Sequence, residues 1–564
     1  MQPTHQAFWP DRLPHAIGVP ATSLWDNLAI SVRRWPEKPA MVFFDRSTTY
    51  RELGQQVDAL AGALSDLGVK RGDHVLVDMQ NTPQLVIAHL AILRANAVVV
   101  PVNPMNLAAE LKHYIADSEA KIAITTGDLA RELATASNAL PPTERLKHLV
   151  VSPFTDCLDP ATRETPSMAL AWRDWLLKVH PLPTLEGGDV HKWAHLLALD
   201  MPPPEHVVGA NDVALLPYTS GTTGLPKGCV HHHSSVMHNA LASNLWFGMT
   251  VETIALAVVP MFHITGIVAV LHAAIAAGAT MVVMPRWDRD VGGHLISRWK
   301  VTSWINIPTM IIDLLASPHF KRYDLSSLRC IAGGGAAMPQ AVAQRLLEEF
   351  NLSYQEAYGL TETAGPSHAN PPAHAKQQCL GIPFLSADAR VVDPETLQAL
   401  APGQSGEIVI HGPQVFQGYW KRRDDTESAF VELDGKRFFR SGDMARIDDE
   451  GYFFITDRLK RMINASGFKV WPAEIELMLF KHPAIQEACV ISTRDAYRGE
   501  SVKAVLVLRP THNDTSPEEI LAWCRQNMAA YKVPRQVQFI EALPKSGSGK
   551  VMWRLLQQKE DQQQ

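Results

Sequence analysis

The chain has 564 residues, of which 46% are hydrophobic and 20% charged, and its formal net charge is −6. Such a length indicates three or four folding units of ordinary globular composition. This mildly acidic net charge argues against a nucleic-acid-binding protein, which would normally have a basic domain or stripe. Its six cysteines are scattered without a CxxC pair, which fits a cytoplasmic protein better than a disulfide framework or a zinc site. The first ten residues do not have the pattern of a secretory signal.

Strand-like and helix-like patterns alternate through the first part of the chain. Strands are predicted at 40–44, 74–79, 98–102 and 121–125, and helices at 50–67, 83–93 and 108–117. This alternation favours a mainly parallel sheet covered by helices on both faces. Residues 135–207 are less regular and are interpreted as surface excursions with some helix.

The segment 253–285 contains no Asp, Glu, Lys or Arg and is long enough to span a bilayer. It is interrupted by Pro260, Gly266 and Gly278, however. Short apolar runs divided in this way indicate strand, turn, buried helix and strand. We therefore expect no integral membrane span.

The pattern changes after residue 387. Short strands at 389–392, 407–411, 444–448 and 452–456 predict a small, largely antiparallel subdomain over 387–456. The C-terminal stretch predicts a compact α+β unit, with helices at 472–480 and 517–528 and strands at 486–491, 502–508 and 536–540. The expected domains are 1–458 and 459–564.

The strongest local signal is the loop 218–228, Tyr-Thr-Ser-Gly-Thr-Thr-Gly-Leu-Pro-Lys-Gly, which follows an apolar strand. Its small residues let backbone N–H groups approach an anion, and its hydroxyls and Lys227 add donors and charge. The Walker A pattern is absent. The loop predicts a phosphate site, and the alternative is an ordinary Gly/Ser/Thr-rich turn.

The loop resembles the signature of the AMP-forming acyl-CoA synthetase, adenylation-domain and luciferase superfamily. Further motifs of that family follow in order: Pro260-Met-Phe-His263, Gly333-Gly-Gly-Ala-Ala337, Tyr358-Gly-Leu-Thr-Glu-Thr363, Gly406 to Trp420, Arg440-Ser-Gly-Asp443, Asp457-Arg-Leu-Lys460 and Pro544-Lys-Ser-Gly-Ser-Gly-Lys550. The resemblance covers about Trp25 to Leu556 and is most like the medium- and long-chain fatty-acid–CoA ligases. It implies an α/β fold with a large N-terminal AMP-binding domain of mainly parallel, helix-covered sheets, the small antiparallel β subdomain, and a small mobile α+β C-terminal domain.

The resemblance implies a site for ATP and AMP. Its residues are Thr219, Ser220, Gly221, Thr222, Thr223, Gly224, Lys227, Gly335, Ala336, Ala337, Tyr358, Gly359, Thr361, Glu362, Asp443, Arg458 and Lys550. The Tyr358 ring can stack on adenine, and the Thr361 hydroxyl can bind a phosphate. Glu362 offers Mg²⁺ a hard oxygen ligand, and Thr219 is the second expected ligand of this ion. Asp443 can accept hydrogen bonds from the ribose. The alternatives are a helix N-cap at 358–363 and solvated surface charges at Asp443 and Arg458.

The resemblance makes Lys550 the adenylation lysine. A cation there stabilises the charge that develops when a carboxylate attacks the α-phosphate, whereas the alternative is a solvated lysine near a terminus. The expected catalytic residues are Lys550, Glu362, Thr219 and His263. Lys460 resembles the hinge between two catalytic states. The loop for the thioester step comprises Ser466, Gly467, Phe468 and Lys469.

His263 stands where amino-acid-activating members carry an acidic residue, so an amino-acid substrate is disfavoured. A satisfied core histidine is the alternative. The expected acyl pocket comprises His263, Ile264, Gly266, Ile307, Thr309, Gly333 and Gly359. Three adjacent histidines, 231–233, do not converge on one metal ion, and only His233 matches a family position.

The leading hypothesis is an ATP-dependent acid–thiol ligase. It converts a carboxylic acid to an acyl-AMP with release of pyrophosphate and then transfers the acyl group to coenzyme A, with Mg²⁺ as cofactor and a medium- or long-chain fatty acid as substrate. The alternatives are an aryl-acid–CoA ligase, a ligase that loads a carrier protein, and a non-catalytic nucleotide-binding relative. A homodimer is compatible with the sequence.

Overall fold

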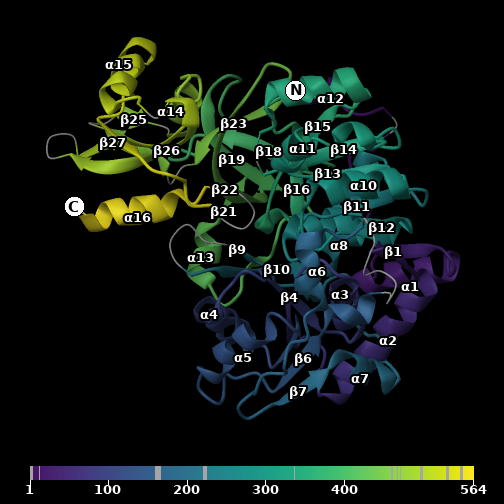
Figure 1. Cartoon of the computed structure of the whole chain (residues 1–564). Helices are drawn as coiled ribbons and strands as arrows, with labels where there is room; N and C mark the ends of the chain where they lie inside the picture. Colours follow the sequence, from purple (N-terminus) through teal and green to yellow (C-terminus); the bar gives the residue numbers. More distant parts are fainter. Residues whose placement is uncertain are drawn as a thin grey trace.

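The computed structural model describes the chain with the exception of residues 1–3, 12, 159–166, 220–224, 336, 459–460, 466–467, 471, 496–498, 513, 529–531, 546–550 and 564. It is an α/β protein with a separate C-terminal domain, which lies at the upper left of Figure 1 in yellow and yellow-green. Among the described residues, no helix is both long and apolar enough to cross a bilayer.

The first nine-stranded sheet is formed by segments from both ends of the N-terminal part. In spatial order its strands are β17 (Ile382–Pro383), β16 (Gly365–Ala369), β15 (Tyr354–Leu360), β14 (Cys330–Gly334), β13 (Ser303–Asn306), β11 (Ile254–Ala257), β12 (Thr280–Val283), β1 (Pro39–Phe43) and β2 (Arg46–Thr49). The strands from β15 to β1 are parallel, and the outer strands β2, β16 and β17 are antiparallel to their neighbours.

The second nine-stranded sheet uses the part of the chain between. In spatial order its strands are β20 (Gly418–Tyr419), β10 (Lys227–His232), β8 (Val213–Leu215), β4 (Val98–Val102), β3 (His74–Asp78), β5 (Ile122–Thr126), β6 (His148–Ser152) and β7 (Asp189–Lys192), and β9 (Tyr218–Thr219) pairs with β10. The strands from β8 to β7 are parallel. Both sheets therefore confirm the mainly parallel arrangement expected from the sequence.

Helices cover these sheets, and some lie between them (Figure 1). The N-terminal helices are α1 (Leu24–Arg34), α2 (Tyr50–Asp66), α3 (Pro83–Arg94), α4 (Ala108–Ser118), α5 (Ala130–Asn138), α6 (Leu170–Leu177), α7 (Trp193–Ala198), α8 (His233–Phe247), α9 (Ala273–Ala277), α10 (Arg289–Trp299), α11 (Pro308–Leu315), α12 (Gln340–Phe350) and α13 (Arg423–Ser428). The shorter helical turns are η1 (Thr4–Phe8), η2 (Phe154–Cys157), the π-helix η4 (Gly266–His272), η5 (Phe320–Arg322) and η6 (Thr361–Thr363).

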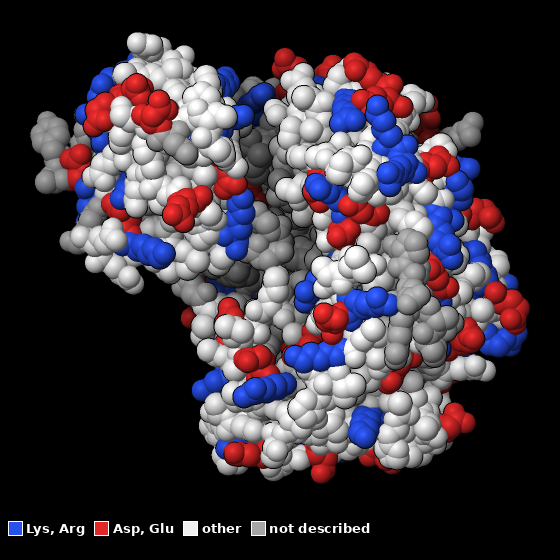
Figure 2. Space-filling model, viewed as in Figure 1, with Lys and Arg blue, Asp and Glu red and all other residues white. Residues whose placement is uncertain are grey.

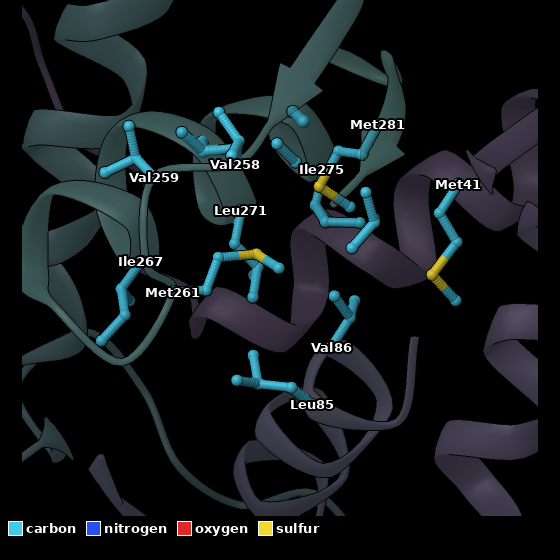
Figure 3. Close-up of a cluster of buried hydrophobic side chains, with 14 of the residues drawn as sticks. Met41, Leu85, Val86, Val258, Val259, Met261, Ile267, Leu271, Ile275 and Met281 are labelled. Carbon is cyan, nitrogen blue, oxygen red and sulfur yellow. The ribbon is translucent and has the colours of Figure 1, made fainter. Parts of the chain in front are cut away.

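One hydrophobic core joins the two sheets. Its members include Met41 and Met281 of the first sheet and Val75 and Val77 of the second. Figure 3 shows Leu85 and Val86 of α3 beside residues of η4 and α9 in this core. Helix α3 is apolar all round, and its residues from Pro83 to Leu93 are buried, as expected for a helix enclosed on every side. Its start is fixed by Pro83 and by the Thr82 hydroxyl, which accepts from the Leu85 N–H at 3.1 Å.

The small antiparallel subdomain is confirmed. Its strands are β18 (Asp388–Val392), β19 (Ser405–His411), β22 (Lys436–Ile447), β21 (Phe430–Leu433) and β23 (Phe453–Arg458), and all their described pairings are antiparallel. The strand predicted at 444–448 is the end of the longer strand β22, which continues back through Asp443 to Lys436.

The C-terminal domain has its own sheet and core. Its strands are β25 (Phe468–Val470), β24 (Ile463–Ala465), β27 (Gly499–Leu508), β26 (Ile485–Asp495) and β28 (Gln536–Phe539). Its helical elements are α14 (Pro472–Leu479), η8 (Pro510–His512), α15 (Pro517–Asn527) and α16 (Trp553–Gln563). The α+β prediction is confirmed, but β24, β25 and α16 were not predicted.

The description of 135–207 as surface excursions is wrong in part. Strand β6 lies inside the second sheet, and Trp172 and Trp193 are buried in the main core. Because β6 has only five residues, its apolar run is too short for periodicity to distinguish a strand from a loop. The strand–turn–helix–strand prediction for 253–285 is confirmed, with η4 and α9 forming the buried helical part.

Candidate active site

The two ends of the loop 218–228 form an antiparallel pair, in which Thr219 lies opposite Lys227 and Tyr218 opposite Gly228. The predicted phosphate-binding residues Ser220, Gly221, Thr222, Thr223 and Gly224 lie outside the described residues. At the base of the loop, the Tyr218 hydroxyl donates to the Asp117 carboxylate at 2.8 Å. The loop is therefore anchored to helix α4 on one side and to strand β10 on the other.

Lys227 lies at the point where this loop meets the β20–α13 region. Its ammonium group forms an ion pair with Asp425 in the first turn of α13. The same nitrogen lies 5.3 Å from the centroid of the Tyr419 ring. Lys227 is mostly shielded from solvent, with a side-chain exposure of 17%. Its charge is therefore held close to Tyr419, which in turn contacts Glu362.

Glu362 is buried at the turn between β15 and β16, with only 8% of its surface exposed. The Tyr419 hydroxyl donates to its Oε1 atom at 2.9 Å, and its carbonyl oxygen accepts from the Phe416 N–H at 2.8 Å. Burial and then the nearby Glu362 charge raise the pKa of Tyr419, so this tyrosine stays a donor. A buried carboxylate that offers hard oxygen atoms fits a small divalent cation such as Mg²⁺.

Two side chains of the β10–α8 region hold the turn that carries Thr361 and Glu362. The His231 Nε2 atom lies 2.7 Å from the Thr361 carbonyl oxygen. Burial lowers the pKa of His231 to about 4, so the ring is neutral at pH 7 and donates from Nε2. The Asn239 amide nitrogen lies 3.0 Å from the Thr363 carbonyl oxygen and 2.9 Å from that of Pro366. Neither role could be predicted from the sequence, because the turn that these side chains contact lies 130 and 124 residues further along the chain.

The motif residues Tyr358 and Asp443 are in direct contact. The Tyr358 hydroxyl donates to Asp443 Oδ2 at 2.7 Å, and Asp443 is only 2% exposed. Asp443 is also paired with Arg458 across strands β22 and β23, although the Arg458 side chain lies outside what the structure describes. The interpretation of Asp443 as a solvated surface charge is therefore wrong.

The glycines beside Tyr358 allow the strands to approach closely. A Cβ atom on Gly333 would lie 2.1 Å from the Asn306 carbonyl oxygen, and one on Gly359 would lie 2.0 Å from that of Gly365. Gly335 adopts a φ of +83°, which favours glycine. Ala337, two residues after Gly335, is exposed, and Ala336 lies outside the described residues.

Glu356 is a second buried carboxyl group near these glycines, and sequence reasoning missed it. It lies opposite Gly333 across the β14–β15 pair. Its Oε1 atom accepts from the Gln378 N–H at 2.8 Å. Burial raises the pKa of Glu356 to about 7, although hydrogen bonds from the Gln378 and Met338 N–H groups partly oppose the shift. The sequence of β15 gave no signal that this carboxyl group is enclosed, because Glu356 follows another polar residue, Gln355.

The expected acyl-pocket residues lie in four segments of the chain. His263 is exposed, so the alternative of a core histidine is wrong. Ile264 is buried, and Gly266 begins η4, where a Cβ atom would lie 2.1 Å from the Pro260 carbonyl oxygen. At the start of α11, Ile307 is half-buried and Thr309 exposed. Gly333 lies between Asn306 of β13 and Glu356 of β15, and Gly359 lies opposite Pro366 of β16.

Several predicted residues cannot be placed. Lys460, Ser466, Gly467 and Lys550 lie outside the described residues, as do the side chains of Phe468 and Lys469. The chain on either side of 546–550 is nevertheless held together, since Lys545 and Val551 form a β-bridge and the Met552 N–H donates to Pro544 at 2.7 Å. Figure 2 shows a hollow between the C-terminal domain and the rest of the molecule.

Comparison with known proteins agrees with these features. Residues 28–420 match the family model of the AMP-binding enzyme, and residues 474–550 match that of the AMP-binding enzyme C-terminal domain. The chain therefore belongs to the AMP-binding enzyme family. Within it, the chain is an AMP-forming acyl-CoA synthetase, for which ATP and coenzyme A are substrates.

Three relatives show the extent of the similarity. The long-chain-fatty-acid–CoA ligase of Bacillus subtilis (strain 168) is 34% identical over 98% of this chain and 97% of its own length. The feruloyl-CoA synthase of Amycolatopsis sp is 34% identical over 92% of this chain and 95% of its own. The crystal structure of ATP-bound MatB from Rhodopseudomonas palustris is 26% identical, with a TM-score of 0.79, and covers 97% of this chain and 100% of that chain.

Proposed function

We propose that the enzyme acts on a medium- or long-chain fatty acid. The observation that carries this proposal is the uncharged run Gly266–His272, a π-helix whose residues are all buried, which begins just after the exposed His263. Ligand pockets are mostly apolar, and π-helical turns occur frequently at functional sites. The name of the Bacillus subtilis relative supports the same substrate class.

The proposed reaction has two steps, and in each of them negative charge on phosphate groups has to be stabilised. The acid's carboxylate attacks the α-phosphorus of ATP and expels pyrophosphate, and the thiolate of coenzyme A then attacks the acyl carbon and expels AMP. We assign Lys550 to the charge that builds on the α-phosphate and Lys227, with the loop 218–228, to the other phosphates. Adenine would contact Tyr358 and the segment 335–337. The ribose would contact Asp443 and Arg458.

Mg²⁺ would be held by Glu362 with Thr219, and its charge would neutralise phosphate oxygens when ATP binds. Tyr419 orients the Glu362 carboxylate for this role. The Thr361 hydroxyl would bind a phosphate oxygen, because His231 fixes the backbone at that residue.

We further propose that domain 459–564 pivots at Lys460. In one orientation it would bring Lys550 to the site, and in the other the loop Ser466–Lys469. A cytoplasmic location is proposed from the free cysteines, of which all except Cys157 are buried. A homodimer stays a prediction.

A second candidate substrate is an aryl acid. The similarity to the Amycolatopsis feruloyl-CoA synthase, at 34% identity, supports an aryl acid. The similarity to the Bacillus subtilis ligase, also at 34% identity, supports a fatty acid equally. A carrier protein as acceptor has no comparable support.

Pyrophosphate release measured over a series of fatty and aryl acids, with and without coenzyme A, tests the proposal. We expect fatty acids to give the highest kcat/KM and CoA-dependent turnover, and Lys550→Ala to lower the adenylation rate by ~100-fold or more. Lys559→Ala, an exposed lysine on α16, is the matched control and should retain wild-type rates. Preference for aryl acids would overturn the substrate assignment, and normal adenylation by Lys550→Ala would overturn the role of that lysine.

A further inference from the structure

A group of potential metal ligands lies at the edge of the second sheet, away from the nucleotide site. His148 is the first residue of β6, and Asp189 and His191 belong to the neighbouring edge strand β7. The parallel register places Asp189 opposite His148 and His191 opposite Val150. Since side chains two residues apart in a strand lie on the same face, Asp189 and His191 both flank His148 on one face of the sheet.

The distances within this group suit a metal ion. The His148 Nδ1 and His191 Nε2 atoms lie 3.1 Å apart, and one atom from each of the three side chains lies within 4.8 Å of the others. Ligand atoms of a tetrahedral zinc ion are each about 2.0–2.2 Å from the metal, which places them roughly 3.3 Å from one another. Only the Asp189 carboxylate would have to move closer. It is exposed, and among the described contacts no hydrogen bond or ion pair holds it elsewhere.

The types of ligand limit the ion. Two imidazoles and one carboxylate suit zinc and neighbouring transition metals, whereas Mg²⁺ and Ca²⁺ prefer oxygen ligands alone. A hydrogen bond between two neutral rings would explain the 3.1 Å contact by itself. The Asp189 carboxylate on the same face is the third ligand that a metal ion would add to this contact.

We propose that His148, Asp189 and His191 form a binding site for Zn²⁺ or a similar transition-metal ion, with water completing the coordination. The ion would join edge strand β7 to β6 and would hold helix α7, which begins directly after β7. Strands β8, β4, β3, β5 and β6 separate β7 from β10, which carries Lys227. The site is therefore structural and takes no part in adenylation.

The test uses full-length enzyme without a histidine tag, freed of metal with a chelator. Titration with Co²⁺ should give one equivalent of tetrahedral d–d absorption, which Zn²⁺ displaces, and Zn²⁺ should raise the midpoint of thermal unfolding. His191→Ala and His148→Ala should weaken binding by at least ~10–100-fold and abolish this rise. Asp189→Asn changes only an exposed side chain, so it should fold normally and weaken binding to a smaller extent.

His195→Ala is the matched control, because His195 is an exposed histidine on α7, close in sequence to the site but outside the ligand group. It should bind Co²⁺ as the wild type does, and acyl-CoA synthesis should be unchanged in all these variants. Absence of the cobalt spectrum in the wild type would overturn the proposal. So would equal binding by wild type and the His148 and His191 variants, since this would mean only adventitious binding to other histidines.

Discussion

Tyr419 and Glu362 are 57 residues apart in the chain, yet the tyrosine hydroxyl contacts the carboxylate that we assign to Mg²⁺. Phe416, three residues earlier, donates its backbone N–H to the carbonyl oxygen of the same glutamate. The segment 416–419, which ends in β20, therefore holds both the backbone and the side chain of Glu362. A carboxylate held in this way keeps its orientation before the ion and ATP bind.

Tyr419→Phe should lower kcat/KM for pyrophosphate release by about tenfold or more and raise the Mg²⁺ concentration needed for half-maximal rate. The reason is that a hydrogen bond to a charged group contributes ~1.5–3 kcal/mol. Steady-state rates measured across a Mg²⁺ series check this. Tyr323→Phe removes a similar bond to the Asp290 carboxylate, 2.8 Å long, on α10 and serves as the control. An unchanged Mg²⁺ dependence in Tyr419→Phe would contradict the positioning role.

Glu356 should make stability depend on pH. Because burial raises the pKa of Glu356 from an ordinary value near 4.5 to about 7, the folded protein retains a proton that the unfolded chain releases. The resulting stability is full below pH ~4.5, decreases as the pH rises to about 7, and stays low above it. The total loss is on the order of 3 kcal/mol at most.

Urea unfolding midpoints of wild type and Glu356→Gln, measured from pH 5 to pH 8, test this dependence. The glutamine variant cannot ionise at this position and should lose part of the decrease seen in the wild type. Identical pH profiles for the two proteins would show that Glu356 does not titrate in this range.

At the scale of elements, the contact between β15 and β16 carries two residues of the proposed nucleotide site. Tyr358 lies on β15 before the turn, and Glu362 lies in η6 within it. Gly359 permits the close approach of the strands, because a Cβ atom there would overlap the Gly365 backbone. The turn itself has a positive φ at Ala364 and at Gly365, and Asn239 holds its carbonyl groups.

Gly359→Ala should separate these strands and displace Tyr358 from Asp443. Overpacking against backbone costs ~1–3 kcal/mol, and we expect adenylation to fall by more than tenfold. Thermal unfolding and ATP binding would measure the two effects. Gly18→Ala is the control, because no atom lies within 4 Å of a Cβ at that exposed position. Wild-type ATP affinity in Gly359→Ala would show that the close approach is not needed.

Helix α16 is attached to the C-terminal sheet by a buried ion pair. Glu560 bonds to Lys503 of β27 and accepts from the Thr493 hydroxyl at 2.6 Å. Since α16 follows 546–550 directly, this contact fixes one end of the segment that carries Lys550.

Glu560→Ala leaves Lys503 buried without its partner, which should cost about 3–5 kcal/mol and release α16. Hydrogen exchange of α16 and β27 should increase in this variant and return toward normal in Lys503→Met/Glu560→Leu, where both charges are removed. Equal exchange in the wild type and the single variant would refute this anchoring.

For the whole molecule, sequence reasoning predicted the features that depend on local pattern. Alternating strands and helices gave the parallel sheets, and the ordered motifs named Tyr358 and Asp443, which are in direct contact. It could not predict His231, Asn239, Tyr419 or Glu356, because their roles come from contacts between segments far apart in the chain. It also missed strand β6 and left open whether His263 is a core histidine, since burial depends on which segments pack together and a short pattern does not specify them.

The order of the strands affects how the protein is made on the ribosome. The chain starts the first sheet with β1 and β2, leaves it to form the second, and returns only at β11. The parallel partner of Met41 is Met281, so strand β1 can pair with β12 only after about 240 further residues have been synthesised. At ~5–20 residues per second, this interval lasts at least ten seconds. During that time β1 can pair only with β2 and leaves its other edge unpaired, so we expect the yield of the protein to depend on chaperones that bind such exposed apolar segments during translation.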